Sequence, residues 1–180
     1  MKTRQPVNNV PHPSERDTIN IRLKSFARAY VDALKETLGD NLISVVLYGS
    51  VARGEANVYS DIDLFIISDG LPAGRFVKRK VLKPARALLA KPKEDLVESG
   101  IWSDFSEIIK TREQARKRSY LYLDLSEDAI ILFDKENFFE KLLNEFRLWL
   151  RELGSVRKVF NGYRYWDLKP DFKAGDTVDL

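Results

Sequence analysis

Two short apolar runs in the first half of the chain enclose a polar segment. The first run covers residues 42–47 and the second covers residues 62–67, and turn-forming residues bound both of them. Both runs are rich in β-branched residues, which favour the extended backbone of a buried strand. The runs therefore predict two inner strands of one sheet, joined by a polar connection.

Three longer segments carry apolar residues at helical spacing. They cover Asp17 to Leu38, Arg75 to Lys93 and Glu136 to Leu153, and a glycine follows the first and the last of them. Pro84 lies inside the second segment, where its missing N–H predicts a kink or a division into two helices. We therefore expect two uninterrupted helices and one that is broken near its middle.

The second half of the chain holds further local signals. Thr111 and Gln114 form a capping-box pattern, which predicts the start of a helix. Residues 129–133 fit either a strand or the buried end of a helix. Residues 156–168, with Asn161-Gly162 at the turn, predict a β-hairpin. Its aromatic side chains either form a platform for an acceptor molecule or pack on the domain and cover a sheet edge.

Length and composition fit one domain with an appendage. The chain has 180 residues and is 44% hydrophobic, which allows one well-packed core but not two large domains. We expect a flexible leader at 1–13, a core at 14–125, and a C-terminal helix, hairpin and tail at 126–180 that pack on the core. No apolar run is long enough to cross a bilayer and no signal segment is present, so we expect a cytoplasmic protein without membrane contact.

The scarcity of two residue types narrows the possible chemistry. The sequence has no cysteine and one histidine, His12, which lies between two prolines. Disulfide frameworks, thiolate nucleophiles, cysteine-ligated zinc and histidine-based triads are therefore excluded. Any catalysis by this chain has to use carboxylates, hydroxyls and cations.

Two aspartates stand at the start of the second predicted strand. Because alternate strand residues share a face, Asp61 and Asp63 point the same way while Ile62 points into the core. Two carboxylates so close together repel each other, and a divalent cation between them removes that repulsion. Hard oxygen ligands of this kind suit Mg²⁺ or Mn²⁺.

A glycine-serine pair closes the first predicted strand. Gly49 allows a sharp turn and the close approach of a phosphate, and Ser50 offers a hydroxyl and a backbone N–H. A short helix that starts here would direct its N–H groups at an anion. Arg53 is expected to add a charge-assisted contact to a triphosphate. Ser60, just before the aspartates, completes the candidate nucleotide-binding set.

These residues together carry a family resemblance. Gly49-Ser50, ten intervening residues and Asp61-Ile62-Asp63 resemble the signature of the DNA polymerase β-like nucleotidyltransferase superfamily, in particular its minimal nucleotidyltransferase branch. The resemblance implies an α/β (α+β) nucleotidyltransferase fold, with a mixed β-sheet flanked by helices, followed here by a C-terminal helix and β-hairpin extension. It also implies Mg²⁺ or Mn²⁺ at the carboxylates, and transfer of a nucleoside monophosphate from an NTP, with ATP expected, to a hydroxyl with release of pyrophosphate.

Members of that superfamily place a third carboxylate on a later strand, where it completes the metal site or accepts the proton of the attacking hydroxyl. Glu107 is our candidate because the apolar pair Ile108-Ile109 follows it directly. The predicted catalytic and metal-binding set is therefore Asp61, Asp63 and Glu107, with Asp104 as the second choice for the third acid. An exposed acid at a strand start is the alternative reading of both.

The acceptor is open at this level. Minimal nucleotidyltransferases that pair with helical HEPN toxins modify a protein hydroxyl, so the resemblance implies a protein acceptor or a toxin partner. The alternative function is a catalytically weak or inactive nucleotide- or partner-binding module, such as an antitoxin-like protein. Residues 71–93 contain eight basic side chains and no acid, which fits either a solvated helix face or a surface for triphosphate, RNA or an acidic partner. No RNA-recognition motif supports the RNA alternative.

Overall fold

The computed structural model describes residues 13–72, 74–173 and 177–178. Except for Pro13, the predicted leader lies outside the described residues. None of the helices in these ranges is both long enough and apolar enough to cross a membrane.

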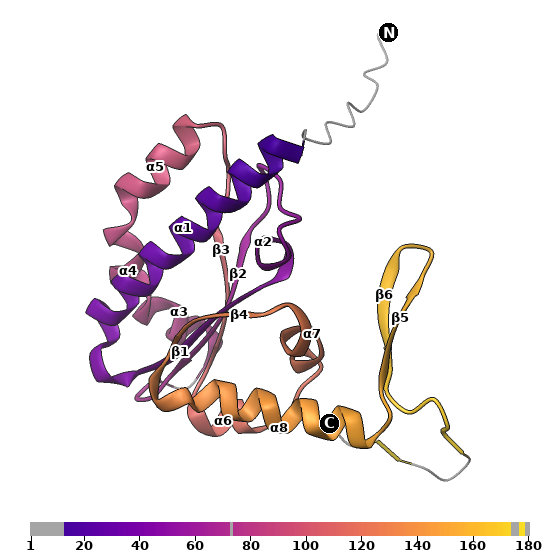
Figure 1. Cartoon of the computed structure of the whole chain (residues 1–180). Helices are drawn as coiled ribbons and strands as arrows, with labels where there is room; N and C mark the ends of the chain where they lie inside the picture. The colour runs from indigo at the N-terminus through magenta and orange to yellow at the C-terminus, as the bar shows by residue number, and fades with distance from the viewer. Residues whose placement is uncertain (1–12, 73, 174–176, 179–180) are drawn as a thin grey trace, which may run out of the picture.

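A mixed four-stranded sheet forms the centre of the protein (Figure 1). Its strands, in spatial order, are β3 (Phe105–Lys110), β2 (Ile62–Ser68), β1 (Leu42–Tyr48) and β4 (Ile130–Asp134). β1 pairs antiparallel with β2 and with β4, while β2 and β3 are parallel. The two apolar runs are thus the two central strands, as predicted, and the segment 129–133 belongs to an edge strand.

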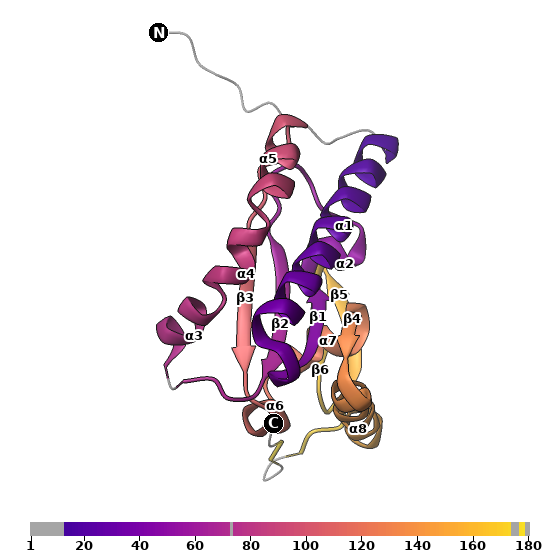
Figure 2. The ribbon, with the colours of Figure 1, turned by 90° about the vertical axis from the view of Figure 1, so that its left-hand side faces the viewer.

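Helices cover both faces of this sheet (Figures 1 and 2). On one face lie α1 (Pro13–Leu38), α4 (Lys83–Leu88) and α5 (Ala90–Glu98), preceded by the short helix α3 (Arg75–Val81). On the other face lie α6 (Arg112–Arg116), α7 (Leu121–Asp128) and α8 (Phe138–Glu152). The short helix α2 (Gly49–Arg53) follows β1, and the 3₁₀ turns η1 (Gly39–Asn41) and η2 (Lys135–Asn137) precede β1 and α8.

Alternation along β2 divides the interior into two cores. Ile62, Leu64 and Ile66 pack in the core under α1, while Phe65 and Ile67 pack in the second core under α7 and α8. Asp63 belongs by this alternation to the second face. The sheet is therefore buried on both sides, which explains why the runs that form β1 and β2 are almost continuously apolar.

Most predicted elements are confirmed, with some changes at their ends. α1 begins four residues before the predicted Asp17, and the segment with Pro84 is divided into α3, α4 and α5. Thr111 caps α6 through the predicted capping box with Gln114. Helix α7 was not predicted, because its eight residues are too few for a clear periodic pattern.

The C-terminal hairpin forms a sheet of its own, from β5 (Val156–Phe160) and β6 (Tyr163–Asp167). It stands beside α7 and extends away from the body of the protein (Figure 1). Phe160 is 68% exposed and Tyr163 is 79% exposed, whereas Trp166 packs against the second core. The alternative in which the aromatic rings pack on the domain and cover a sheet edge is therefore wrong for the tip of the hairpin.

Candidate functional site

The centre of the candidate site is Asp63, on the face of β2 that α7 and α8 cover. Its neighbours in the sheet are Tyr48 at the end of β1 and Ser106 on β3. Paired residues of adjacent strands project to the same side of the sheet, so both side chains share the face of Asp63. Asp61 is exposed and directly precedes β2, two residues earlier. The charge of Asp61 acts on the Asp63 carboxyl, so the two acids are neighbours, although Asp61 itself lies outside the strand.

Gly49 turns the chain against the Asp63 carboxylate. Its φ of 73° lies in the left-handed region, which a glycine adopts without strain. A Cβ atom added at Gly49 would lie 2.2 Å from Oδ2 of Asp63, closer than any normal contact. Both the conformation and the contact therefore require glycine here, and the glycine-serine turn lies directly beside the aspartate pair.

A comparison of Gly49→Ala with Gly54→Ala separates the effect of the backbone conformation from the effect of the contact with Asp63. Gly54 has nearly the same φ, 75°, but nothing lies within 4 Å of its would-be Cβ. Both variants should lose about 1–2 kcal/mol of unfolding free energy through backbone strain. Only Gly49→Ala should also lose nucleotidyl transfer, because it displaces the Asp63 carboxylate. Chemical denaturation and a transfer assay measure both effects, and equal transfer by the two variants would contradict the contact argument.

The site carries unbalanced negative charge. Burial raises the pKa of the Asp63 carboxyl, and the charge of Asp61 adds to the increase, although the Ser106 hydrogen bond and the charge of Arg53 oppose it. Burial also raises the pKa of the Tyr48 hydroxyl to about 12, with further increases from Asp63 and Asp124. Asp124, on α7, is an acid beside the site that the sequence analysis missed, because its helix was not predicted.

Arg53 lies next to the site and forms an ion pair with Glu55. Its Nε lies 2.7 Å from Oε2 of Glu55, and Oε1 of the same carboxylate lies 2.9 Å from Arg164 on β6. These charges hold the pKa of Glu55 below its usual range, chiefly through the hydrogen bond from Arg53. A cavity of about 360 Å³ lies between them, and Arg157 and Asp128 also line it. The hairpin therefore contributes cations next to α2.

Ser60 forms hydrogen bonds within the loop before β2. Its hydroxyl accepts a hydrogen bond from the N–H of Asn57 at 2.9 Å, and its carbonyl accepts one from the Ser103 hydroxyl at 2.8 Å. These bonds close the loop between α2 and β2. Ser60 thus shapes the connection that delivers Asp61.

Glu107 does not join Asp61 and Asp63, which corrects the predicted third carboxylate. It pairs with Leu64, so its side chain projects to the α1 face of the sheet, opposite to Asp63. There it is buried, and it accepts a hydrogen bond from the Tyr30 hydroxyl at 2.6 Å. Arg86 donates to both of its carboxylate oxygens, at 3.0 and 2.8 Å. Glu107 is therefore the buried member of an ion pair whose other member, Arg86, is 36% exposed.

Asp104, the second choice for the third acid, is also engaged elsewhere. It lies 3.3 Å from Arg86 and 3.1 Å from Lys93, and it accepts the N–H of Phe105 at 2.8 Å. Ser106 occupies the position on β3 that faces Asp63. Among the described residues, no group of three or more histidines, cysteines or acids is arranged to hold a metal ion.

The donor set that is present fits Mg²⁺ through two carboxylates. Mg²⁺ in enzymes of phosphate chemistry is commonly held by one or two carboxylates, with waters and substrate phosphates as the other ligands. Burial and the charge of Asp61 raise the pKa of Asp63, and a bound cation would oppose both effects. The structure thus shows an α/β protein with two neighbouring carboxylates beside a glycine turn.

The comparison with known families agrees with this class. The sequence model of the family described as "Nucleotidyltransferase domain" matches residues 28–158, which is more than half of the 180 residues. The chain therefore belongs to the nucleotidyltransferase domain family, and its mixed sheet is the core of a nucleotidyltransferase fold. The matched range contains the glycine-serine turn, both aspartates and α8.

Several relatives are similar over most of their length. A Methanocaldococcus jannaschii protein named "Putative protein adenylyltransferase MJ1305" is 43% identical over 158 residues, which are 87% of this chain and 97% of that protein. A solved toxin–antitoxin structure with AMP-PNP is 14% identical, with a TM-score of 0.43, over 71% of this chain and 92% of that one. A tri-AMPylated Shewanella oneidensis HEPN toxin in complex with an MNT antitoxin gives 12% identity and a TM-score of 0.39, over 73% and 92%.

Proposed function

We propose that this nucleotidyltransferase moves AMP from ATP to a hydroxyl group of a protein and releases pyrophosphate, with Mg²⁺ or Mn²⁺ bound at Asp61 and Asp63. The observation that carries the proposal is the contact of the Asp63 carboxylate with the Gly49 turn. The contact supports the proposal because the acids that would bind the metal and the turn that would bind the phosphates are neighbours. A metal-bound triphosphate needs both groups at one point.

Each residue of the site has a defined task in this proposal. Asp61 and Asp63 hold the metal, which neutralises the charge of the triphosphate and of the transition state. Gly49 and the backbone of Ser50 receive the terminal phosphates, and the Ser50 hydroxyl donates to them. Arg53 exchanges Glu55 for a phosphate oxygen, since a dianionic phosphate attracts a guanidinium more strongly than a carboxylate already shared with Arg164 does.

The choice of a protein acceptor has two supports. The 43% identical relative carries the name of a protein adenylyltransferase, and this chain covers 97% of it. The hairpin also presents exposed apolar and aromatic side chains: Val159 lines the cavity beside Arg53, and Phe160 and Tyr163 lie at the tip. Exposed aromatic surface of this kind is common where proteins bind each other.

A second candidate function is a binding module that transfers slowly or not at all. One observation favours it: in the described part of the chain, Ser106 rather than an acid faces Asp63, so the expected third carboxylate is missing. Such a module would bind a nucleotide or a helical toxin partner. If the protein does transfer AMP, the exposed Asp124 beside Tyr48 is the acid to test as proton acceptor.

The test is incubation of the pure protein with each α-labelled NTP and Mg²⁺ or Mn²⁺, alone and with candidate protein and RNA acceptors. We expect label from ATP on a protein and none with the Asp61→Ala/Asp63→Ala variant. Label on RNA would overturn the protein acceptor. Metal-dependent ATP binding without transfer to any acceptor would overturn the enzyme and leave the binding module.

A further inference from the structure

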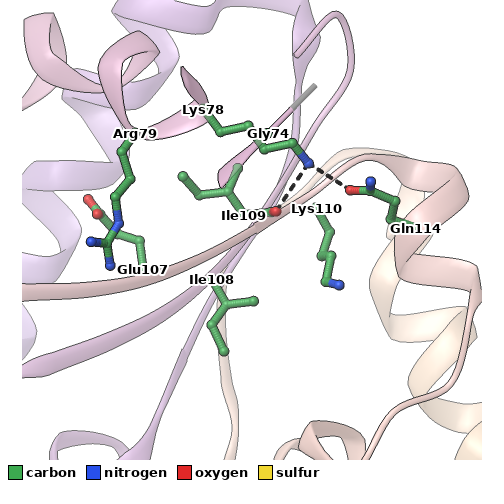
Figure 3. Close-up of a pocket in the computed structure, with 8 residues that line it drawn as sticks. All are labelled: Gly74, Lys78, Arg79, Glu107, Ile108, Ile109, Lys110 and Gln114. Carbon is green, nitrogen blue, oxygen red and sulfur yellow. Dashed lines mark hydrogen bonds between the residues drawn. The ribbon is translucent and has the colours of Figure 1, made fainter. Parts of the chain in front are cut away.

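A separate cavity lies at the outer edge of β3 (Figure 3). Its volume is about 490 Å³, and its lining includes Lys78, Arg79, Glu107, Ile108, Lys110 and Gln114. β2 lies between β3 and β1, so this edge is on the far side of the sheet from the Gly49 turn. The cavity is thus distinct from the site of Asp61 and Asp63.

Lys78 is the central feature of this cavity. The residue is only 7% exposed, although it carries an ammonium group. Figure 3 shows it extended across the cavity, where Nζ donates to Oε1 of Gln114 at 2.7 Å and to the carbonyl of Ile109 at 3.4 Å. Both partners are neutral. Burial, with a smaller effect of Lys110, lowers the pKa of Lys78, as expected for a desolvated ammonium without a counter-ion.

The other charges around Lys78 leave the cavity positive. Lys110 and Arg79 also line it, and neither forms an ion pair with an acid of the described residues. Glu107 is the acid in the lining, but both of its oxygens are held by Arg86, whose charge balances it. Of the three cations that line the cavity, Lys78 is buried, Lys110 is partly exposed and Arg79 is exposed. A buried charge such as that of Lys78 is costly unless a ligand compensates it.

We propose that this cavity is a binding site for a small phosphomonoester. Lys78, Lys110 and Arg79 match the charge and the several acceptor oxygens of a phosphate dianion better than those of a single carboxylate. The volume is in the range of small-molecule sites and exceeds what a bare phosphate fills. Ile108 and the Gln114 amide offer an apolar wall and a polar group to the remainder of the ligand.

The geometry around Lys78 is prepared for such a ligand. The Gln114 side chain that accepts from Lys78 also accepts the N–H of Thr111 at 3.2 Å in the capping box of α6. The ammonium is therefore held between α3, β3 and α6 before any ligand arrives. A preorganised donor loses little conformational entropy on binding, which favours affinity.

Isothermal titration calorimetry without divalent ions tests the site with inorganic phosphate, ribose 5-phosphate and AMP as probes. We expect saturable binding of ribose 5-phosphate or AMP to the wild type, with acetate at least tenfold weaker. Lys78→Met and Lys110→Gln should each weaken binding about tenfold, the usual effect of losing one charge-assisted hydrogen bond. The control is Lys80→Gln, an exposed residue of the same helix outside the cavity lining, which should change the affinity less than twofold.

Two cavity variants are used so that the test remains informative if one of them misfolds. The ammonium of Lys78 also donates a hydrogen bond to a backbone carbonyl of β3, and its loss could disturb the fold. Circular dichroism therefore has to show that Lys78→Met is folded. Lys110 makes no such bond to a described residue, so Lys110→Gln remains informative by itself. Absence of binding by every phosphomonoester would overturn the proposal, and so would binding that both cavity variants retain or that acetate matches. Binding of AMP that Ser50→Ala abolishes and Lys110→Gln leaves intact would assign it to the nucleotide site instead.

Discussion

Replacing Asp63 by asparagine should lower nucleotidyl transfer about 1,000-fold, because a metal ligand of this kind is worth several kcal/mol in the transition state. The same substitution should leave the free energy of unfolding at neutral pH equal to or above that of the wild type. The ionised Asp63 carboxyl is half-buried, and its raised pKa shows that folding disfavours its charge. A variant that is more stable and inactive is the signature of a residue kept for chemistry.

The effect of Asp63→Asn on the free energy of unfolding should depend on pH. The folded pKa of Asp63 is above its unfolded value, so its cost is absent below the unfolded pKa and grows as pH rises through the folded pKa. The stability difference between Asp63→Asn and the wild type should therefore be small in acid and largest at neutral pH. Thermal denaturation over that range measures it. The exposed Asp61→Asn is the matched control, which should lose transfer without becoming more stable. Unchanged transfer by both variants would refute the site.

Replacing Glu107 by alanine should have the opposite profile. It leaves the buried Tyr30 hydroxyl and the partly exposed Arg86 without their shared partner, and a buried polar group that loses its partner costs about 1–3 kcal/mol. The free energy of unfolding should fall by that amount, measured by urea denaturation. Transfer per folded molecule should stay close to that of the wild type, because the side chain faces away from Asp63.

Glu107→Gln is the control for this result. It keeps the size of the side chain and one oxygen for Tyr30 and Arg86, so it should cost less stability than alanine does. If Glu107→Ala were stable and inactive, the residue would belong to the metal site after all. The expected results for Glu107→Ala and Asp63→Asn differ clearly, because the first variant loses stability and the second loses nucleotidyl transfer.

The contrast between Asp63 and Glu107 shows how far the sequence could predict this site. The aspartate pair follows from alternation within one strand, which is a local property. The placement of Glu107 depends on the register between β2 and β3, which pairs Asp63 with Ser106 and Leu64 with Glu107. A shift of one residue would have placed Glu107 on the face of Asp63. Register is set by tertiary packing, so the apolar pair after Glu107 could not reveal it.

The basic segment 71–93 shows the same limit for charge. The sequence shows that this segment contains no acids, but it does not show which acids elsewhere in the chain pair with its basic residues. Arg86 and Lys93 pair with acids at and before β3, and Lys91 pairs with Glu94 and Asp95 on its own helix. Lys78 turns inward instead. The segment is therefore neither a uniform solvated face nor a continuous polyanion surface, and only the packing of α3 to α5 on β3 divides its roles.

The hairpin packs on the core at its base but is held along its side by ion pairs. At its root, Trp166 and Leu168 pack in the core under α8. Its flank is held by partly exposed ion pairs, Arg164 to Glu55 at 2.9 Å and Arg157 to Asp128 at 3.0 Å. Pairs of this kind are worth about 0–1 kcal/mol each and weaken as salt screens them. We therefore expect higher ionic strength to loosen the hairpin from Glu55 and Asp128, beside Arg53, while its packed end stays in place.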